Sequence, residues 1–517
     1  MPLVVTIWRY CAQASAPNIR RRAELQSQTA FEHRGIVEGY YGKTYTPEDR
    51  LAWVRDIGQW GMNRYLYAPK DDPLHREHWR DPYPQETLDE FAALVQCGDE
   101  AGVRVGFAIS PGLSIHYAND DDVEGLIAKF HGFTELGSRF ISLALDDVPT
   151  TLQHKDDRAA FENLAQAHVA LAHRIKAELP NDTLLWLVPT DYIGTQPSDY
   201  LEEIGRSLDP KIEVAWTGRT VISPTITGDE IRARAQLLGR RLLIWDNVPV
   251  SDGPMRPMLH LGPYVGRDET LAEHASGILL NPMELPRASR LGVRTAADYL
   301  NAPHNYNAEQ AWGHAAQSLG AGASEAYTLF ARAHRFSPLL PNDRDTELEA
   351  TFDCMRTCHA DGQSAAGSLS DLDAMLNARS SAASEIRTAL DDRELAQELE
   401  PWLESYEAEC LRMRIAVDLL TVFEADSSAA GSTGLTNAID AFFAFSRFEG
   451  RLTHVPGPVK ASFGPRRVMY AQLQSLDDTE ASFGSDPALF IDRCLADTFV
   501  RYAETRVSQL LDAKSAD

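Results

Sequence analysis

Short apolar runs alternate with longer amphipathic segments from Gly35 to about Pro282. The runs are rich in β-branched and aromatic residues, and they lack the strict alternation of a strand with one face in solvent. They predict eight strands, at Gly35–Gly39, Asn63–Ala68, Val103–Ser110, Phe140–Leu145, Thr183–Pro189, Ile212–Thr217, Arg241–Trp245 and Gly277–Asn281. Parallel strands inside a ring of helices are buried on both faces in this way. The pattern therefore predicts an α/β fold, a (β/α)8 TIM barrel.

Helices are expected between these strands. The first has Thr46 as its N-cap, Pro47 at its first position, Asp49 three residues after the cap, and Gly61 at its end. These residues are common start and stop signals of a helix. The other helices are expected at Pro84–Ala101, Asp122–Leu136, Asp156–Leu179, Ser198–Ser207 and Gly228–Leu238.

Beyond about Pro303 the strand-like runs disappear, and long amphipathic segments with short Gly, Ser and Pro breaks indicate an α-helical bundle. Its helices are expected at Ala308–Ser318, Ser324–His334, Thr346–His359, Asp371–Leu390, Ala396–Val422, Gly434–Phe448 and Pro487–Leu511, with a flexible loop at Ser427–Gly434. We therefore expect a disordered leader over residues 1–30, the barrel domain over 31–303 and a helical domain over 304–517.

The composition is that of a folded protein with a strong negative charge. The 517 residues are 44% hydrophobic and 24% charged, and 75 Asp and Glu against 49 Lys and Arg give a net charge of −26. Such a charge repels phosphate backbones and anionic lipids, and no basic patch offsets it. Neither a nucleic acid nor a membrane is therefore an expected partner, and the sequence indicates no oligomeric state.

No run approaches the roughly 18 apolar residues of a membrane helix, and no signal peptide is visible after Met1. The six cysteines are scattered, which favours reduced thiols in the cytoplasm; secretion stays open if Met1 is not the true start. Cys354, Cys358 and His359 could bind a metal, but helix packing is favoured because no second ligand pair lies nearby. The acidic run Asp120–Asp122 lacks the spaced ligands of a calcium loop. No metal and no cofactor are expected.

In a βα barrel, functional groups lie where the strands run into their following loops. The sharpest feature at these places is the pair Asp146 and Asp147, because it follows the wholly apolar Leu143–Leu145. Two adjacent carboxylates in a partly dehydrated pocket cannot ionise equally easily. One could donate a proton while its neighbour stays charged, which is the division of roles that glycoside hydrolysis requires.

Each candidate residue also has a purely structural interpretation. The Asp146 and Asp147 pair could cap the next helix or bind a cation, and Lys70 could pair with Asp71 or Asp72. The remaining candidates could be turn or rim-packing residues: Tyr192, Trp245, Asn247 and Asp252. Their convergence on one barrel mouth favours a functional site.

Several of these segments resemble glycoside hydrolase family 84, the O-GlcNAcase-like β-N-acetylglucosaminidases once described as hyaluronidases. The resemblance covers about residues 33–300 and is carried by Gly35–Gly42, Tyr65–Asp72, Leu145–Asp147, Pro189–Tyr192, Trp245–Asn247, Leu261–Tyr264 and Leu280–Pro282. It implies a retaining exo-β-N-acetylglucosaminidase that removes O-linked GlcNAc from proteins or glycoconjugates. In that mechanism the substrate's own 2-acetamido oxygen attacks the anomeric carbon and forms an oxazoline.

The resemblance also implies a role for each residue. Asp146 orients the acetamido group, and Asp147 is the general acid and later the general base. The substrate-binding residues are Tyr192 and Asn247 at the acetamido group, Trp245 in the pocket wall, and Gly39, Lys70, Asp252 and Asn281 at the sugar hydroxyls.

Two alternatives remain open at this point. A general hexosaminidase or hyaluronidase-type glycosidase would share the sugar pocket and differ in the aglycone cleft, where Lys43–Tyr45 departs from many relatives. A non-catalytic GlcNAc-binding protein is disfavoured because both Asp146 and Asp147 are present.

Overall fold

The computed structural model describes residues 31–337, 339–340, 343, 345–426, 460, 462–463 and 495–516. The chain divides into two compact units. The first contains the chain up to Val248 with Gly266–Glu284 and Val293–Asn307, and the second contains Pro249–Val265, Leu285–Gly292 and the chain from Ala308 onward. The predicted leader, the predicted loop at 427–434 and the predicted helix at 434–448 lie outside the described residues.

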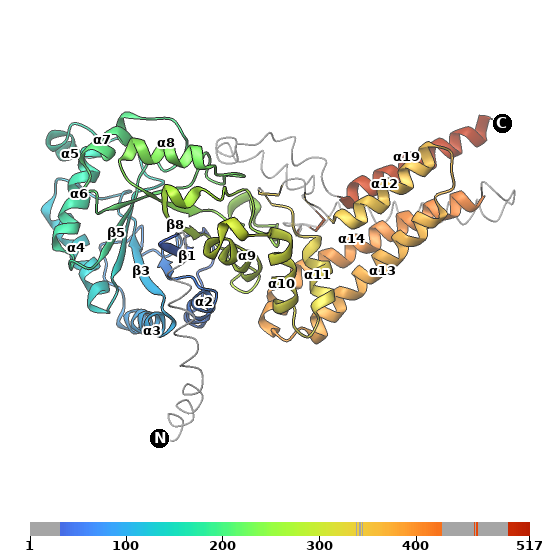
Figure 1. Ribbon diagram of the computed structural model, residues 1–517, viewed down its shortest axis with the longest axis horizontal. Coiled ribbons are helices and arrows are strands. Elements are labelled where there is room, and N and C mark those ends of the chain that lie inside the picture. The colour runs from blue at the N-terminus through green and yellow to red at the C-terminus, as the bar shows by residue number, and fades with distance from the viewer. Residues whose placement is uncertain are drawn as a thin grey trace, which may run out of the picture. The chain divides into compact units, whose positions relative to one another are not determined.

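Eight parallel strands of the first unit pair in sequence order, and the last strand closes the ring on the first. They are β1 (His33–Glu38), β2 (Arg64–Tyr67), β3 (Arg104–Ile109), β4 (Phe140–Ala144), β5 (Leu184–Val188), β6 (Glu213–Trp216), β7 (Leu242–Asp246) and β8 (Ala275–Leu280). Figure 1 shows helices surrounding these strands. Val37, Leu66, Trp186 and Leu279 pack in one buried cluster of the barrel. The predicted (β/α)8 barrel is confirmed.

Helices lie around the barrel strands (Figure 1). They are α2 (Pro47–Gln59), α3 (Gln85–Ala101), α4 (Asp120–Glu135), α5 (Lys155–Ala160), α6 (Leu164–Glu178), α7 (Asp199–Ser207), α8 (Gly228–Leu238) and α9 (Arg290–Asn301). The predicted start of α2 is confirmed, because Thr46 and Asp49 form a capping box and Pro47 opens the helix. Gly61 follows the helix with φ 81°, a left-handed conformation that favours glycine.

The helix prediction was wrong at two places. The single helix expected at Asp156–Leu179 is two helices, because Phe161 has an extended backbone and the Asn163 side chain caps α6 by accepting from the Gln166 N–H at 2.9 Å. Helix α9 was not predicted, although its buried residues recur at helical spacing over Val293–Leu300.

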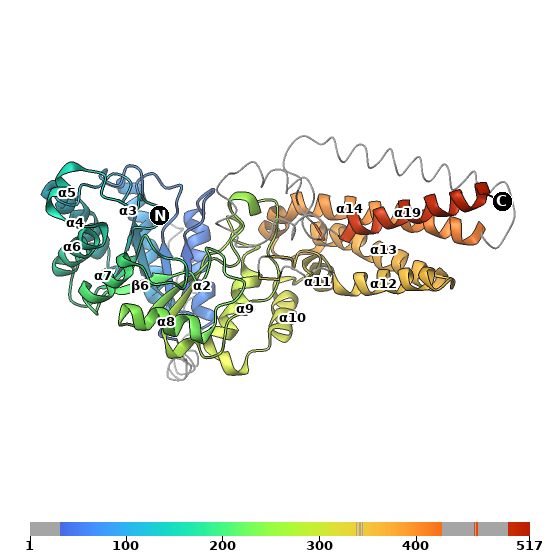
Figure 2. The ribbon, with the colours of Figure 1, turned by 90° about the horizontal axis from the view of Figure 1, so that it is seen from above.

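The second unit is helical, as predicted. Its described helices are α10 (Ala308–Leu319), α11 (Ser324–Arg332), α12 (Thr346–Ala360), α13 (Ala366–Ala389), α14 (Arg393–Asp426) and α19 (Leu495–Ala516). Figure 2 shows α12, α13, α14 and α19 side by side. Arg379 on α13 donates to the carboxylate of the buried Asp345 at 2.7 Å, and the Trp402 indole donates to the Pro257 carbonyl at 2.9 Å. The first contact links α13 to Asp345, the N-cap of α12, and the second links α14 to the 249–265 segment.

Cys354 and Cys358 lie on α12, but not on its packed side. The first is exposed and the second half-buried, whereas Leu348, Phe352 and Met355 are the buried residues of that helix. Within the described ranges, no group of three or more His, Cys, Asp or Glu side chains is placed to hold a metal ion. No described helix has both the length and the apolar character needed to cross a bilayer.

Candidate active site

Eight of the nine predicted site residues lie in the first unit, at the carboxyl ends of six barrel strands. These eight are Gly39 after β1, Lys70 after β2, Asp146 and Asp147 after β4, Tyr192 after β5, Trp245 and Asn247 at the end of β7, and Asn281 after β8. The ninth, Asp252, belongs to the second unit, where it is the N-cap of the 3-10 helix η2 (Gly253–Met255). The roles of all nine residues stay predictions.

Asp146 is a buried carboxylate that is hydrogen-bonded to the ammonium group of Lys70. Its Oδ2 accepts a short hydrogen bond from Lys70 Nζ, and its Oδ1 makes no hydrogen bond to any described residue. Burial would raise the pKa of Asp146, but the charge and hydrogen bond of Lys70 outweigh burial and hold the pKa below its usual value. Asp146 is therefore charged at neutral pH although it is buried.

Asp147 lies in different surroundings, exposed and in a left-handed backbone conformation with φ 52°. Tyr41 donates to its Oδ2 and Tyr192 to its Oδ1, each at 2.9 Å. Burial and the negative charge of Asp147 raise the pKa of both phenols well above their usual value. Both tyrosines therefore remain hydrogen-bond donors at neutral pH.

Two of the structural alternatives are contradicted. Lys70 does not pair with Asp71 or Asp72 but with Asp146, and the Asp72 carboxylate instead accepts from the Tyr67 hydroxyl at 2.9 Å. The aspartate pair does not cap the next helix either, because α5 has His154 as its N-cap.

The opposite side of the mouth is a continuous hydrogen-bond chain. The Trp245 indole donates to Asn247 Oδ1 at 3.0 Å, Asn281 Nδ2 donates to the same oxygen at 2.9 Å, and the Gly39 N–H donates to Asn281 Oδ1 at 3.2 Å. Lys70 Nζ lies 5.9 Å from the centre of the Trp245 ring. Because Lys70 also binds Asp146, it connects these hydrogen-bonded residues to Asp146. A Cβ at Gly39 would lie 2.3 Å from the Trp245 ring, so only glycine fits there.

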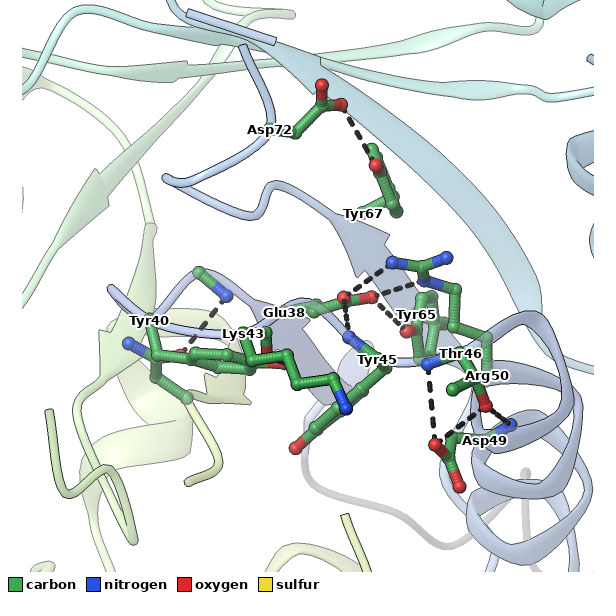
Figure 3. A network of polar contacts seen from close by, with 12 residues as sticks. Glu38, Tyr40, Lys43, Tyr45, Thr46, Asp49, Arg50, Tyr65, Tyr67 and Asp72 are labelled. Carbon is green, nitrogen blue, oxygen red and sulfur yellow. Dashed lines mark hydrogen bonds and ion pairs between the residues drawn. The ribbon is translucent and has the colours of Figure 1, made fainter. Parts of the chain in front are cut away.

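The residue before Gly39, Glu38, forms a buried ion pair with Arg50 (Figure 3). Glu38, the last residue of β1, accepts from Arg50 Nε and Nη2 at 2.9 Å each and from the Tyr65 hydroxyl at 2.6 Å. Its Oε1 also accepts from the Tyr45 N–H at 3.1 Å. Glu38 thus links β1 to β2, to α2 and to the loop that follows Gly39.

Sequence reasoning missed three residues of this site: Glu38, Tyr41 and Arg76. Glu38 and Tyr41 stand inside the quoted motif Gly35–Gly42, so their position was a signal although no role was assigned to them. Arg76 carried no such signal, because it is 71 residues from Asp147, whose carbonyl it contacts.

A hollow of about 730 Å³ lies in the second unit between α12 and α19. Its lining includes Arg356, His359, Tyr502 and Arg506 but none of the predicted site residues. We therefore place the candidate active site at the barrel mouth.

Comparisons with known proteins identify the family. The family model for beta-N-acetylglucosaminidase matches residues 34–332. Protein O-GlcNAcase of Rattus norvegicus and that of Mus musculus are each 34% identical over 277 residues, which are 52% of this chain and 30% of the relative. The chain thus spans about 30% of the length of these curated relatives.

Solved structures match over most of the chain. A mutant O-GlcNAc hydrolase of Thermobaculum terrenum has a TM-score of 0.76 and 30% identity, covering 94% of this chain and 97% of that one. The structure of CpGH84B has a TM-score of 0.75 at 24% identity, over 92% and 77% of the two chains, and supports the fold alone. Because the family model matches more than half of the sequence, the resemblance is confirmed, and the chain belongs to the beta-N-acetylglucosaminidase family of glycoside hydrolases.

Proposed function

We propose that this protein is a retaining exo-β-N-acetylglucosaminidase that removes O-linked GlcNAc from proteins or glycoconjugates through an oxazoline intermediate. One observation carries the proposal beyond the family. Asp146 is a buried, charged carboxylate with one oxygen not hydrogen-bonded to any described residue, and the exposed Asp147 stands next to it.

Asp146 is suited to orient a nucleophile that the substrate brings. Lys70 occupies its Oδ2, so Oδ1 is left to accept the N–H of the sugar's acetamido group. This hydrogen bond would turn the acetamido carbonyl toward the anomeric carbon and increase the negative charge on its oxygen. Attack within one molecule gains from a high effective concentration, and no enzyme carboxylate has to act as nucleophile.

Asp147 is proposed to protonate the glycosidic oxygen and then to deprotonate the water that opens the oxazoline. Its exposed position at the mouth gives it access to the leaving group, and the hydroxyls of Tyr41 and Tyr192 fix its two oxygens. Proton transfer of this kind contributes roughly 10²- to 10⁴-fold to the rate.

The other predicted residues are proposed to bind the sugar. Tyr192 and Asn247 would contact the acetamido group, and Trp245 would form the pocket wall. The sugar hydroxyls would be held by the Gly39 carbonyl, Lys70, Asp252 and Asn281.

For the aglycone, the relatives named Protein O-GlcNAcase and O-GlcNAc hydrolase favour a GlcNAc-modified protein. The test measures hydrolysis of an aryl β-GlcNAc, a GlcNAc-modified protein, an aryl β-GalNAc and hyaluronan under one condition. Efficient release of GlcNAc from the protein supports the proposal. Cleavage of hyaluronan with no release from the protein would favour the hyaluronidase-type alternative, and no turnover of any substrate would favour a binding protein.

A further inference from the structure

Arg76 makes two contacts with the environment of Asp147. It lies buried in the loop between β2 and α3, where its Nη2 donates to the Asp147 carbonyl at 3.0 Å. Its Nη1 donates to the Tyr41 hydroxyl at 2.8 Å, and Tyr41 donates in turn to Asp147 Oδ2 at 2.9 Å. The Arg76 guanidinium therefore contacts the backbone of Asp147 directly and the carboxylate of Asp147 through Tyr41.

The Arg76 contact fixes the direction of the Tyr41 hydrogen bond. A guanidinium has only donors, so the Tyr41 oxygen must accept from it. The single hydroxyl hydrogen of Tyr41 is then left for the Asp147 carboxylate. Without Arg76 that hydroxyl could rotate toward solvent, because Tyr41 is 41% exposed.

The second contact acts on the backbone of Asp147. Its φ of 52° lies in the left-handed region, which residues with a side chain adopt rarely unless their surroundings enforce it. The Arg76 hydrogen bond to the Asp147 carbonyl is made in this conformation, and we infer that it stabilises it.

Arg76 is itself held in place by the barrel. The preceding residue, His75, is buried with its Nδ1 2.7 Å from the Ala108 carbonyl, and its own carbonyl accepts from the Ser110 N–H at 2.9 Å. Burial and the charge of Lys70 lower the pKa of His75 to about 4, so the ring is neutral at ordinary pH. Strand β3 therefore anchors the loop that presents Arg76.

We propose that Arg76 is a positioning residue, which holds the Asp147 carboxylate toward the leaving group through Tyr41 and through the Asp147 carbonyl. This inference rests on the proposed function of Asp147 as the general acid. It predicts that loss of Arg76 damages proton donation selectively and leaves recognition of the sugar intact.

The experiment compares kcat/KM of Arg76→Gln and Tyr41→Phe across β-GlcNAc glycosides whose leaving groups range from a very acidic phenol to an alkyl alcohol. We expect a loss of about 10- to 100-fold on the alkyl glycoside, part of the full effect of a general acid, and little loss on the acidic phenol. Arg76→Lys should recover part of the activity, because an ammonium can replace one of the two donors. Affinity for a sulfur analogue of the oxazoline should stay near the wild-type value.

Arg80→Gln is the matched control, because Arg80 lies in the same loop and pairs with Asp122 at 2.7 Å, away from Asp147. It should leave the dependence on the leaving group unchanged. An equal loss on every leaving group, or a wild-type profile, in folded Arg76→Gln would overturn the inference. If Arg76→Gln does not fold, the test uses Tyr41→Phe and Arg76→Lys instead. A wild-type dependence on the leaving group in both of these variants would then overturn the inference.

Asp147→Asn separates this inference from the proposed function. If that variant loses activity equally on all leaving groups, the assignment of Asp147 as general acid fails. If it shows the selective loss and the Arg76 variants do not, only the role of Arg76 fails.

Discussion

At the scale of single residues, the carboxylates of the neighbours Asp146 and Asp147 lie in different surroundings. Asp146 is buried against Lys70, which keeps it charged, whereas Asp147 is exposed and receives two phenol hydroxyls. The residues alone left open which of the two would donate the proton, and only the resemblance assigned that role to Asp147. The lowered pKa of Asp146 depends on Lys70, which lies 76 residues away in the chain.

The first prediction uses this difference. Asp147→Asn should abolish turnover of glycosides with poor leaving groups but spare those with a very acidic phenol, because these need little proton donation. Asp146→Asn should reduce turnover of both, because every substrate needs its acetamido group oriented. Steady-state kinetics on the two kinds of glycoside measure the contrast, and the reverse pattern would exchange the two roles.

The second prediction concerns pH. The charge of Lys70 opposes burial and lowers the pKa of Asp146, so Lys70→Met leaves burial to raise that pKa. Since the reaction needs charged Asp146, the acid limb of the kcat/KM profile should move to higher pH. Lys70 is also proposed to bind the sugar, so activity should fall at every pH, and the position of the limb is the readout.

Lys43→Ala is the control for this pH experiment, because Lys43 is an exposed lysine on the rim. Its profile should keep the wild-type acid limb. A Lys70→Met profile with an unmoved acid limb would show that Lys70 does not control the charge of Asp146.

At the scale of elements, the step from β1 to α2 shows which contacts the sequence predicts. The capping residues Thr46 and Asp49 are three positions apart, so local spacing was enough to find them. The Glu38 and Arg50 pair was missed, because Glu38 ends an apolar run and its partners come from another strand and a helix. The interruption between α5 and α6 at Phe161 was missed because apolar residues continue at helical spacing across it.

The third prediction tests the Glu38 ion pair. Arg50→Met would leave the Glu38 carboxylate buried without its bidentate partner, and losing one member of such a pair costs about 3–5 kcal/mol. Urea unfolding of the folded protein measures the loss. Thr46→Ala, which removes only the cap of the same helix, should cost about 1 kcal/mol. The double variant Glu38→Gln with Arg50→Met should recover part of the stability, and an Arg50→Met variant as stable as wild type would contradict the account.

At the scale of the whole molecule, topology explains why so much of the site could be predicted. In a closed parallel barrel the carboxyl ends of all strands meet at one rim, so residues far apart in sequence converge there once the eight strands are recognised. What the topology does not specify is the contact between side chains. The bridge from Arg76 through Tyr41 to Asp147 joins two loops and depends on rotamers that no local pattern encodes.

The same topology does not settle the mechanism, because a barrel with two carboxylates at its mouth could also use one of them as the nucleophile. The last prediction separates the two mechanisms through the substrate. If the acetamido oxygen attacks, replacing its methyl hydrogens with fluorine withdraws electrons from it, and kcat/KM should fall progressively with each fluorine. The released sugar should keep the β configuration in proton NMR, because closing and opening the oxazoline are two inversions. A rate that is insensitive to fluorine would indicate an enzyme nucleophile, and an α-configured product would indicate a single inversion; either result would remove the proposed role of Asp146.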